Sequence, residues 1–116
     1  MSTVKSLANA IRNDSVLLDV PIVLEMAIYK GKQQIYSDLT SQSLSRMAPF
    51  VESFTLLGLG DNLSLSLDER KSIIVYRISE KGVLTIVTNE KIGTTLIKLK
   101  EITEKYGKQI DELLEE

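Results

Sequence analysis

Residues 89–102, NEKIGTTLIKLKEI, follow directly on the apolar run GVLTIV at residues 82–87. From Ile92 onward, apolar residues recur every three or four positions, which is the period of an amphipathic helix, whereas the run before it has the length of a buried strand. We therefore expect a strand that leads into a long C-terminal helix. We expect Asn89 to cap this helix, and Gly93, which lacks a side chain, to let the helix backbone lie close to the sheet.

Two more strands are expected just before this segment. The sequence LSLSL at residues 63–67 alternates apolar and polar residues, and SIIVYRI follows at residues 72–78. Short polar links separate these strands from each other and from residues 82–87, so the three should form an antiparallel meander. In SIIVYRI, apolar residues fall on both faces of the strand, which predicts that both faces of the sheet are covered.

The N-terminal part of the chain predicts a helix followed by a hairpin. Residues 4–14 carry apolar side chains at helical spacing, and residues 21–29 read as one strand. Gly31, which can adopt a positive φ, lies in the expected turn, and residues 33–37 return as a second strand.

A middle helix is expected between this hairpin and the meander, ending near Gly58. Its apolar stripe consists of Leu44, Met47, Ala48, Val51, Phe54 and Thr55. Pro49 lies within it, and a proline in a helix interior removes a backbone hydrogen bond and clashes with the preceding turn. Either the helix kinks at Pro49 or its regular part starts near Met47.

These elements predict a single α+β domain over residues 1–116, in the order helix, strand, strand, helix, three strands, helix. The expected architecture is a five-stranded antiparallel sheet with helices on both faces.

Composition removes several classes of function. The chain has no cysteine and no histidine, which are the commonest activated nucleophile and general base, so we expect no enzyme, no bound metal and no cofactor. A net charge of -2 gives no reason to expect a nucleic-acid partner. No signal peptide and no apolar run long enough to insert into a membrane are evident, so a cytoplasmic location is expected.

The order of elements, with the passages IYKGKQQIYS, MAPFVESFTLLGLGDNLSLSLDERKSIIVYRI and GVLTIVTNEKIGTTLIKLKEI, resembles the roadblock/dynein light chain family of small adaptors. The resemblance runs from about Pro21 to the C-terminal helix. The resemblance rests on the glycine of the first hairpin, the Leu-Gly pair after the middle helix and the start of the last helix. These residues are Gly31, Leu57, Gly58, Asn89, Ile92, Gly93 and Leu96. Longin and profilin-like folds share much of the same order.

The resemblance implies a homodimer in which the third strands of two subunits pair across a two-fold axis and the middle helices lie side by side. The residues expected at this interface are Leu63, Ser64, Leu65, Ser66, Leu67, Met47 and Val51. The strand itself permits such pairing, because it has no charge or proline to protect an exposed edge. Leu65→Pro is expected to remove an edge N–H group and so break the dimer.

The resemblance further implies that the dimer binds a small Ras-like GTPase as a scaffold or regulator, without donating catalytic residues. The chain contains no P-loop motif of its own. Partner contacts are expected at Ser45, Arg46 and Glu52, which fall outside the apolar stripe of the middle helix. Taken singly, each of these residues is more typical of a solvated helix surface than of a partner contact.

Two other classes of function stay open as alternatives. An enzyme would have to use Asp68, Glu69 or Asp38 with Lys71 or Tyr36, but Asp68 and its neighbours lie in a polar link, where charge needs no other explanation. A small-ligand sensor, or a longin or profilin-like interaction module, would hold its ligand between sheet and helices. The low aromatic content and the core spacing of Leu and Ile favour packing over a cavity.

Overall fold

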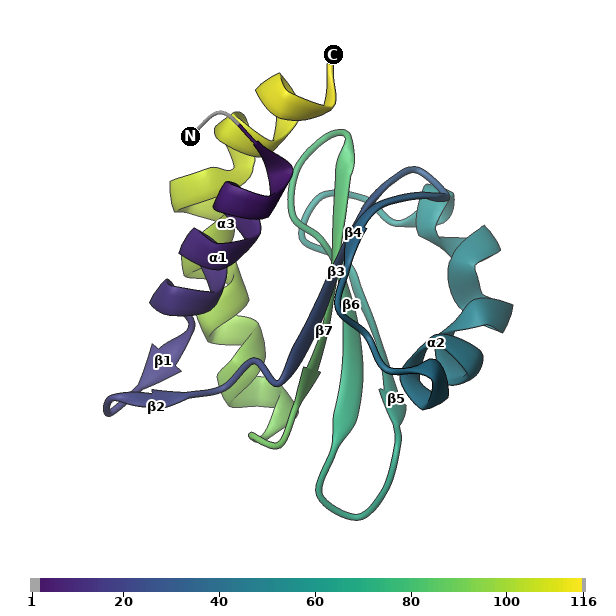
Figure 1. Ribbon diagram of the computed structural model, residues 1–116, viewed down its shortest axis with the longest axis vertical. Coiled ribbons are helices and arrows are strands. Elements are labelled where there is room, and N and C mark those ends of the chain that lie inside the picture. Colours follow the sequence, from purple (N-terminus) through teal and green to yellow (C-terminus); the bar gives the residue numbers. More distant parts are fainter. Residues whose placement is uncertain (1–2, 116) are drawn as a thin grey trace.

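A five-stranded antiparallel sheet with the strand order β4-β3-β7-β6-β5 forms the centre of the computed structural model, which describes residues 3–115 (Figure 1). The strands are β1 (Val16–Leu17), β2 (Val20–Pro21), β3 (Glu25–Lys30), β4 (Gln33–Ser37), β5 (Asn62–Ser66), β6 (Ser72–Arg77) and β7 (Gly82–Thr88). The helices are α1 (Val4–Asp14), α2 (Ser41–Met47), the 3-10 helix η1 (Ala48–Leu56) and α3 (Ile92–Leu114). The predicted α+β class and five-stranded antiparallel sheet are confirmed.

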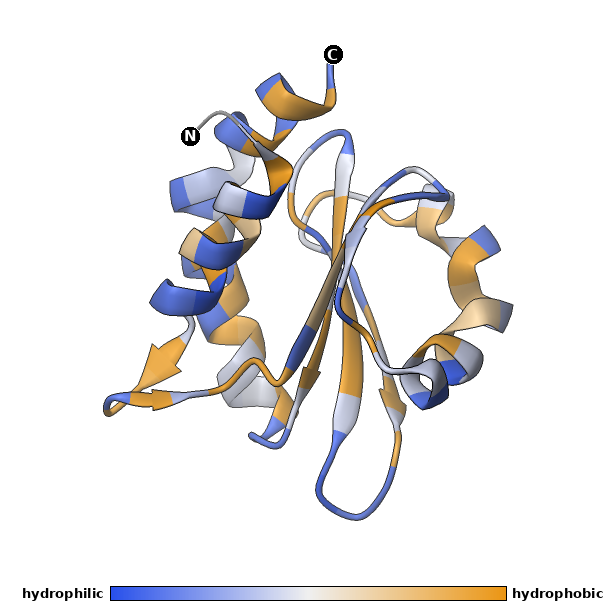
Figure 2. Cartoon of the chain, in the orientation of Figure 1, coloured by the Kyte–Doolittle hydropathy of each residue, from blue (hydrophilic) through white to orange (hydrophobic). Residues whose placement is uncertain are grey.

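The sheet separates two apolar clusters. In Figure 1, α1 and α3 lie on one side of the sheet and α2 with η1 on the other. Along β6, Ile74 and Tyr76 belong to the cluster beneath α1 and α3, whereas Ile73 and Val75 belong to the cluster beneath α2 and η1. Apolar residues run along the central strands (Figure 2), because each strand is buried on both faces.

Helix α1 is fixed to α3 by a polar contact at its C-terminal end. The Asp14 carboxylate accepts hydrogen bonds from the Tyr106 hydroxyl and from Lys105 Nζ, the latter at 2.7 Å. The Lys105 ammonium, followed by the Tyr106 hydroxyl, holds the pKa of Asp14 below its ordinary value. On the other side of α1, Arg12 forms an ion pair of 2.7 Å with Asp38. The N-terminal helix is therefore held both at α3 and at the residue that follows β4.

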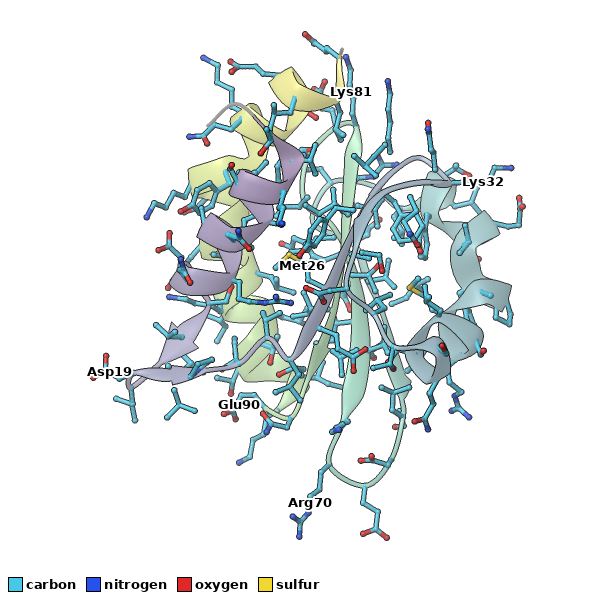
Figure 3. The ribbon with its side chains drawn as sticks, viewed as in Figure 1. Asp19, Met26, Lys32, Arg70, Lys81 and Glu90 are labelled. Carbon is cyan, nitrogen blue, oxygen red and sulfur yellow. The ribbon has the colours of Figure 1, made fainter. Side chains whose placement is uncertain are left out.

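A small hairpin, β1–β2, precedes the main sheet and was not predicted. Its turn residues Leu18 and Asp19 have φ values of +50° and +66°, and Asp19 lies at the tip that projects from the molecule in Figure 3. The expected single strand over residues 21–29 is therefore wrong at its start. Pro21 closes the small hairpin, and the main strand β3 begins only at Glu25.

Pro49 breaks the middle helix, as expected, but its regular part lies before the proline. The α-helix ends at Met47, and residues 48–56 continue as the 3-10 helix η1, with Pro49 in its first turn. Within η1, a proline at that position loses no hydrogen bond, because the first N–H groups of a helix have no partner inside that helix. The alternative in which the regular helix starts near Met47 is wrong.

The change of helix type alters which side chains are buried. A 3-10 helix has three residues per turn, so Val51, Phe54 and Leu57 share the face that packs on the sheet. Ala48 and Thr55, which were predicted in the buried stripe from the α-helical period, are exposed.

The start of α3 differs from the expectation in two ways. Lys91, rather than Asn89, occupies the N-cap position, and no side chain caps the helix there. A Cβ atom added at Gly93 would meet nothing within 4 Å, so this glycine does not bring the helix close to the sheet. The close approach occurs at Gly107, where a Cβ would lie 3.1 Å from the carbonyl oxygen of Ile78.

Candidate functional site

The outer edge of β5 is the place where the sequence predicts pairing with a second subunit. β5 pairs along its length with β6, with Leu63 opposite Val75 and Leu65 opposite Ile73. Within residues 3–115, no strand pairs with its other side. An exposed edge of this kind presents backbone N–H and C=O groups that another strand can bind.

The backbone hydrogen bonds at both ends of β5 determine which groups face outward. Leu67 N donates to Lys71 O at 2.9 Å, and Arg77 N donates to Asp61 O at 3.0 Å, so residues 61 and 67 point their backbone groups toward β6. Because this orientation alternates along an antiparallel strand, residues 63 and 65 also point inward. The backbone groups of Asn62, Ser64 and Ser66 therefore face the open side.

This alternation corrects the expected effect of Leu65→Pro. The Leu65 N–H faces β6, so proline at this position would remove a hydrogen bond inside the sheet rather than one at the edge. The N–H of Ser64 faces outward. Proline at position 64 would remove an edge donor and leave the pairing with β6 intact.

The side chains of β5 divide between the two faces of the sheet. Leu63, Leu65 and Leu67 are half-buried against the α2 and η1 cluster, whereas Ser64 and Ser66 are exposed on the opposite face. Leu67 lies one residue beyond the end of the strand.

The two interface candidates outside β5 lie at different depths. Val51 is half-buried and packs on the same cluster. Met47 is only 1% exposed, so it supports this surface from within its own subunit and cannot reach a partner.

The three residues expected to contact a partner are all exposed, but two of them already have contacts of their own. Arg46 Nη2 donates to the backbone carbonyl of Ser66 at 2.8 Å. Glu52 forms an ion pair of 3.0 Å with Lys32 from the β3–β4 turn, which is labelled in Figure 3. Ser45 lies on the exposed side of α2.

Sequence reasoning missed two apolar side chains on the outer side of η1. Phe50 is 36% exposed and Leu56 is 83% exposed. The α-helical period leaves both residues outside the expected apolar stripe but about 120° apart, so it does not group them on one surface. A three-residue period from Pro49 onward places Phe50 and Leu56 together on one face, apart from the buried Phe54.

The residues of the alternative enzyme hypothesis have structural contacts. Asp68 Oδ1 accepts hydrogen bonds from the backbone N–H groups of Arg70 and Lys71, and the first of these is the main cause that lowers the pKa of Asp68. Asp38 accepts from the backbone of Met26 and from the Tyr36 hydroxyl. These carboxylates stabilise a turn and a strand end.

A surface hollow at the end of the sheet is lined by side chains of both charges, among them Arg70, Lys71, Glu90 and Lys91. It lies between the β5–β6 turn and the start of α3, not between the sheet and a covering helix, where the sensor hypothesis expects a ligand.

Among the described residues, no helix combines the length and apolarity needed to cross a membrane. A scan of the chain against protein-family models and a search of curated proteins both found no match.

Proposed function

We propose that this protein is a non-catalytic adaptor that forms a homodimer through the β5 edge and binds a small Ras-like GTPase in the cytoplasm. The observation that carries the proposal is the open edge at Asn62, Ser64 and Ser66, whose backbone groups face away from β6. The GTPase as the partner comes from the resemblance of the sequence to the roadblock/dynein light chain adaptors.

An antiparallel edge can pair with a second copy of itself. Each outward-facing residue offers both its N–H and its C=O, and a two-fold axis brings identical edges together in opposite directions. With the axis at Ser64, this residue pairs with Ser64 of the other copy, and Asn62 pairs with Ser66. The half-buried leucines of both copies then lie next to each other on the face that carries α2 and η1.

The outer surface of α2 and η1 is the proposed binding surface for the GTPase. It combines the exposed apolar side chains Phe50 and Leu56 with the polar groups of Ser45 and Glu52. Exposed apolar groups surrounded by polar ones are typical of protein interaction surfaces. Binding there requires no catalytic group from this chain.

The dimer is tested by comparing the solution mass of the wild type with that of Ser64→Pro by light scattering and analytical ultracentrifugation. The wild type should be a dimer at high concentration, and Ser64→Pro a folded monomer. Ser64→Ala is the matched control, because it removes the hydroxyl and keeps the edge N–H, and it should remain dimeric. A wild type that stays monomeric, or a Ser64→Pro variant that dimerises as well as the wild type, would refute the proposed edge-paired homodimer.

The GTPase is tested separately with the dimer immobilised and a panel of small Ras-like GTPases loaded with GDP or a non-hydrolysable GTP analogue. Leu56→Glu should abolish binding, since Leu56 is 83% exposed on the proposed surface and contributes little to the core. The control is Ile97→Glu, because Ile97 is 68% exposed on α3, across the sheet. Equal loss in both variants, or no binding by any member, would contradict this half of the proposal.

A further inference from the structure

Arg46 forms a contact between the last turn of α2 and the open edge of β5. Its guanidinium donates to the carbonyl oxygen of Ser66 at 2.8 Å. By the alternation along the strand, this carbonyl is one of the groups that face outward. The only strong donor that the described residues bring to it is thus a side chain twenty positions earlier in the chain.

The same carbonyl is needed when two β5 edges pair. With the two-fold axis at Ser64, the oxygen of Ser66 has to accept from the N–H of Asn62 in the other copy, at about 2.9 Å. The guanidinium of Arg46 holds that oxygen at a similar distance and carries a positive charge, which makes its hydrogen bond stronger than one from a neutral amide. A carbonyl oxygen can accept two hydrogen bonds, but a charged donor already bound to it makes it a weaker acceptor for a second donor, so the two donors compete.

We propose that Arg46 guards the β5 edge: it competes intramolecularly with strand pairing and thereby sets the affinity of the homodimer. The inference rests on the proposed edge-paired dimer and adds its regulation. β5 itself has none of the residues that usually protect an edge, so protection comes from α2. Arg46 contacts one end of the strand only, and Asn62 and Ser64 stay open. The guard therefore weakens pairing without abolishing it.

The test is the dimer dissociation constant of the wild type, Arg46→Ala and Arg46→Lys, measured by sedimentation equilibrium at fixed ionic strength. Arg46→Ala should dimerise about tenfold more tightly, because two guarding hydrogen bonds per dimer no longer have to be released. Arg46→Lys, which keeps the charge but not the planar fork, should fall between the two.

The control is Arg70→Ala, which removes the same charge from the tip of the β5–β6 turn, where Arg70 points away from the sheet (Figure 3). Its dissociation constant should stay within about twofold of the wild type, since the charge lies outside the contact and is screened. Circular dichroism of each variant verifies that the fold is retained.

The outcomes separate the guard from the dimer on which it rests. If the wild type dimerises, Ser64→Pro does not, and Arg46→Ala dimerises equally or more weakly, the guard is refuted and the dimer stands. If wild type and Arg46→Ala are both monomeric at high concentration, both proposals fail. A monomeric wild type with a dimeric Arg46→Ala, whose dimer is abolished by adding Ser64→Pro, would refute the wild-type homodimer and would show that the guard prevents pairing rather than weakening it.

Discussion

Two glycines in the same helix are expected to respond in opposite ways to replacement by alanine. Gly93 lies in the first turn of α3, and a Cβ there would meet no atom within 4 Å. Gly107 lies further along α3, and a Cβ there would be 3.1 Å from the carbonyl oxygen of Ile78. Both substitutions add the same methyl group to a helical backbone, so they differ only in the space around it.

The magnitudes follow from two opposing effects. Alanine in place of glycine stabilises a helix by about 0.5–1 kcal/mol, and Gly93→Ala should gain this amount in the free energy of unfolding. At Gly107 the neighbour is a backbone oxygen at the end of β6, where Ile78 N is hydrogen-bonded to Gly82 O at 3.2 Å. Because this strand end cannot yield easily, an overpacking cost of about 1–3 kcal/mol should cancel or exceed the gain.

Urea titration followed by circular dichroism measures both variants against the wild type at one protein concentration, because dimerisation would make the midpoint depend on concentration. For an m-value of about 2 kcal/mol/M, a difference of 1 kcal/mol separates the two midpoints by about 0.5 M. If Gly107→Ala were stabilised as much as Gly93→Ala, the close packing of α3 on the end of β6 would be refuted.

Three further substitutions test other contacts in the same titration. Asp14→Asn should lower the free energy of unfolding at neutral pH and make it depend less on pH in acid. The pKa of Asp14 in the folded protein lies below its ordinary value of 3.8, so the wild type has the stabilisation from this carboxylate above that value and loses it as the pH falls through the folded pKa. Parallel acid profiles of the two proteins would contradict the contact with Lys105. Phe54→Ala should cost about 3–5 kcal/mol, because the ring is fully buried and lies edge-on to Tyr29 at a centroid distance of 5.2 Å; a loss below about 1 kcal/mol would contradict this packing. Leu18→Gly should stabilise by about 1 kcal/mol, since the side chain is 99% exposed and its φ of +50° strains any residue with a Cβ; a destabilised variant would argue against this turn.

Much of the sheet could be predicted because its signals are local. Alternation and short polar links define β5, β6 and β7, and Gly31 takes the positive φ that the β3–β4 turn requires. The hairpin β1–β2 has no such signal. Its turn consists of Leu18 and Asp19, where a two-residue hairpin usually has Asn or Gly, so the sequence contains no recognisable hairpin signal there.

The middle helix shows how a correct local rule can lead to a wrong pattern. Pro49 disturbs the helix, as the sequence predicts. The predicted apolar stripe, however, follows the α-helical period on both sides of the proline. After Pro49 the chain turns with three residues per turn, which exposes Thr55, a residue of the expected stripe, and places Phe50 and Leu56 on one outer face. The exposed apolar surface of η1 follows from that change and could not be read from a single period.

The sequence pattern of β5 determines the face on which each side chain lies but not the direction in which each backbone group points. Alternation in LSLSL assigns the leucines to the packed face and the serines to the exposed one, but it does not determine which backbone groups face outward. That depends on the register with β6, which directs the backbone groups of Ser64, and not those of Leu65, toward the open side.

Protection of an edge, likewise, is not a property of the strand alone. β5 has no charge, proline or bulge, and from its sequence the edge is unprotected. The fold supplies a charge from a neighbouring helix, since Arg46 reaches the outward carbonyl of Ser66. A side chain that binds by one contact can be displaced, whereas a proline in the strand would block pairing permanently. For the proposed homodimer, an edge that is covered at one end in the monomer and free to pair in the dimer favours a displaceable guard on a separate element, and α2 carries Arg46 at that place.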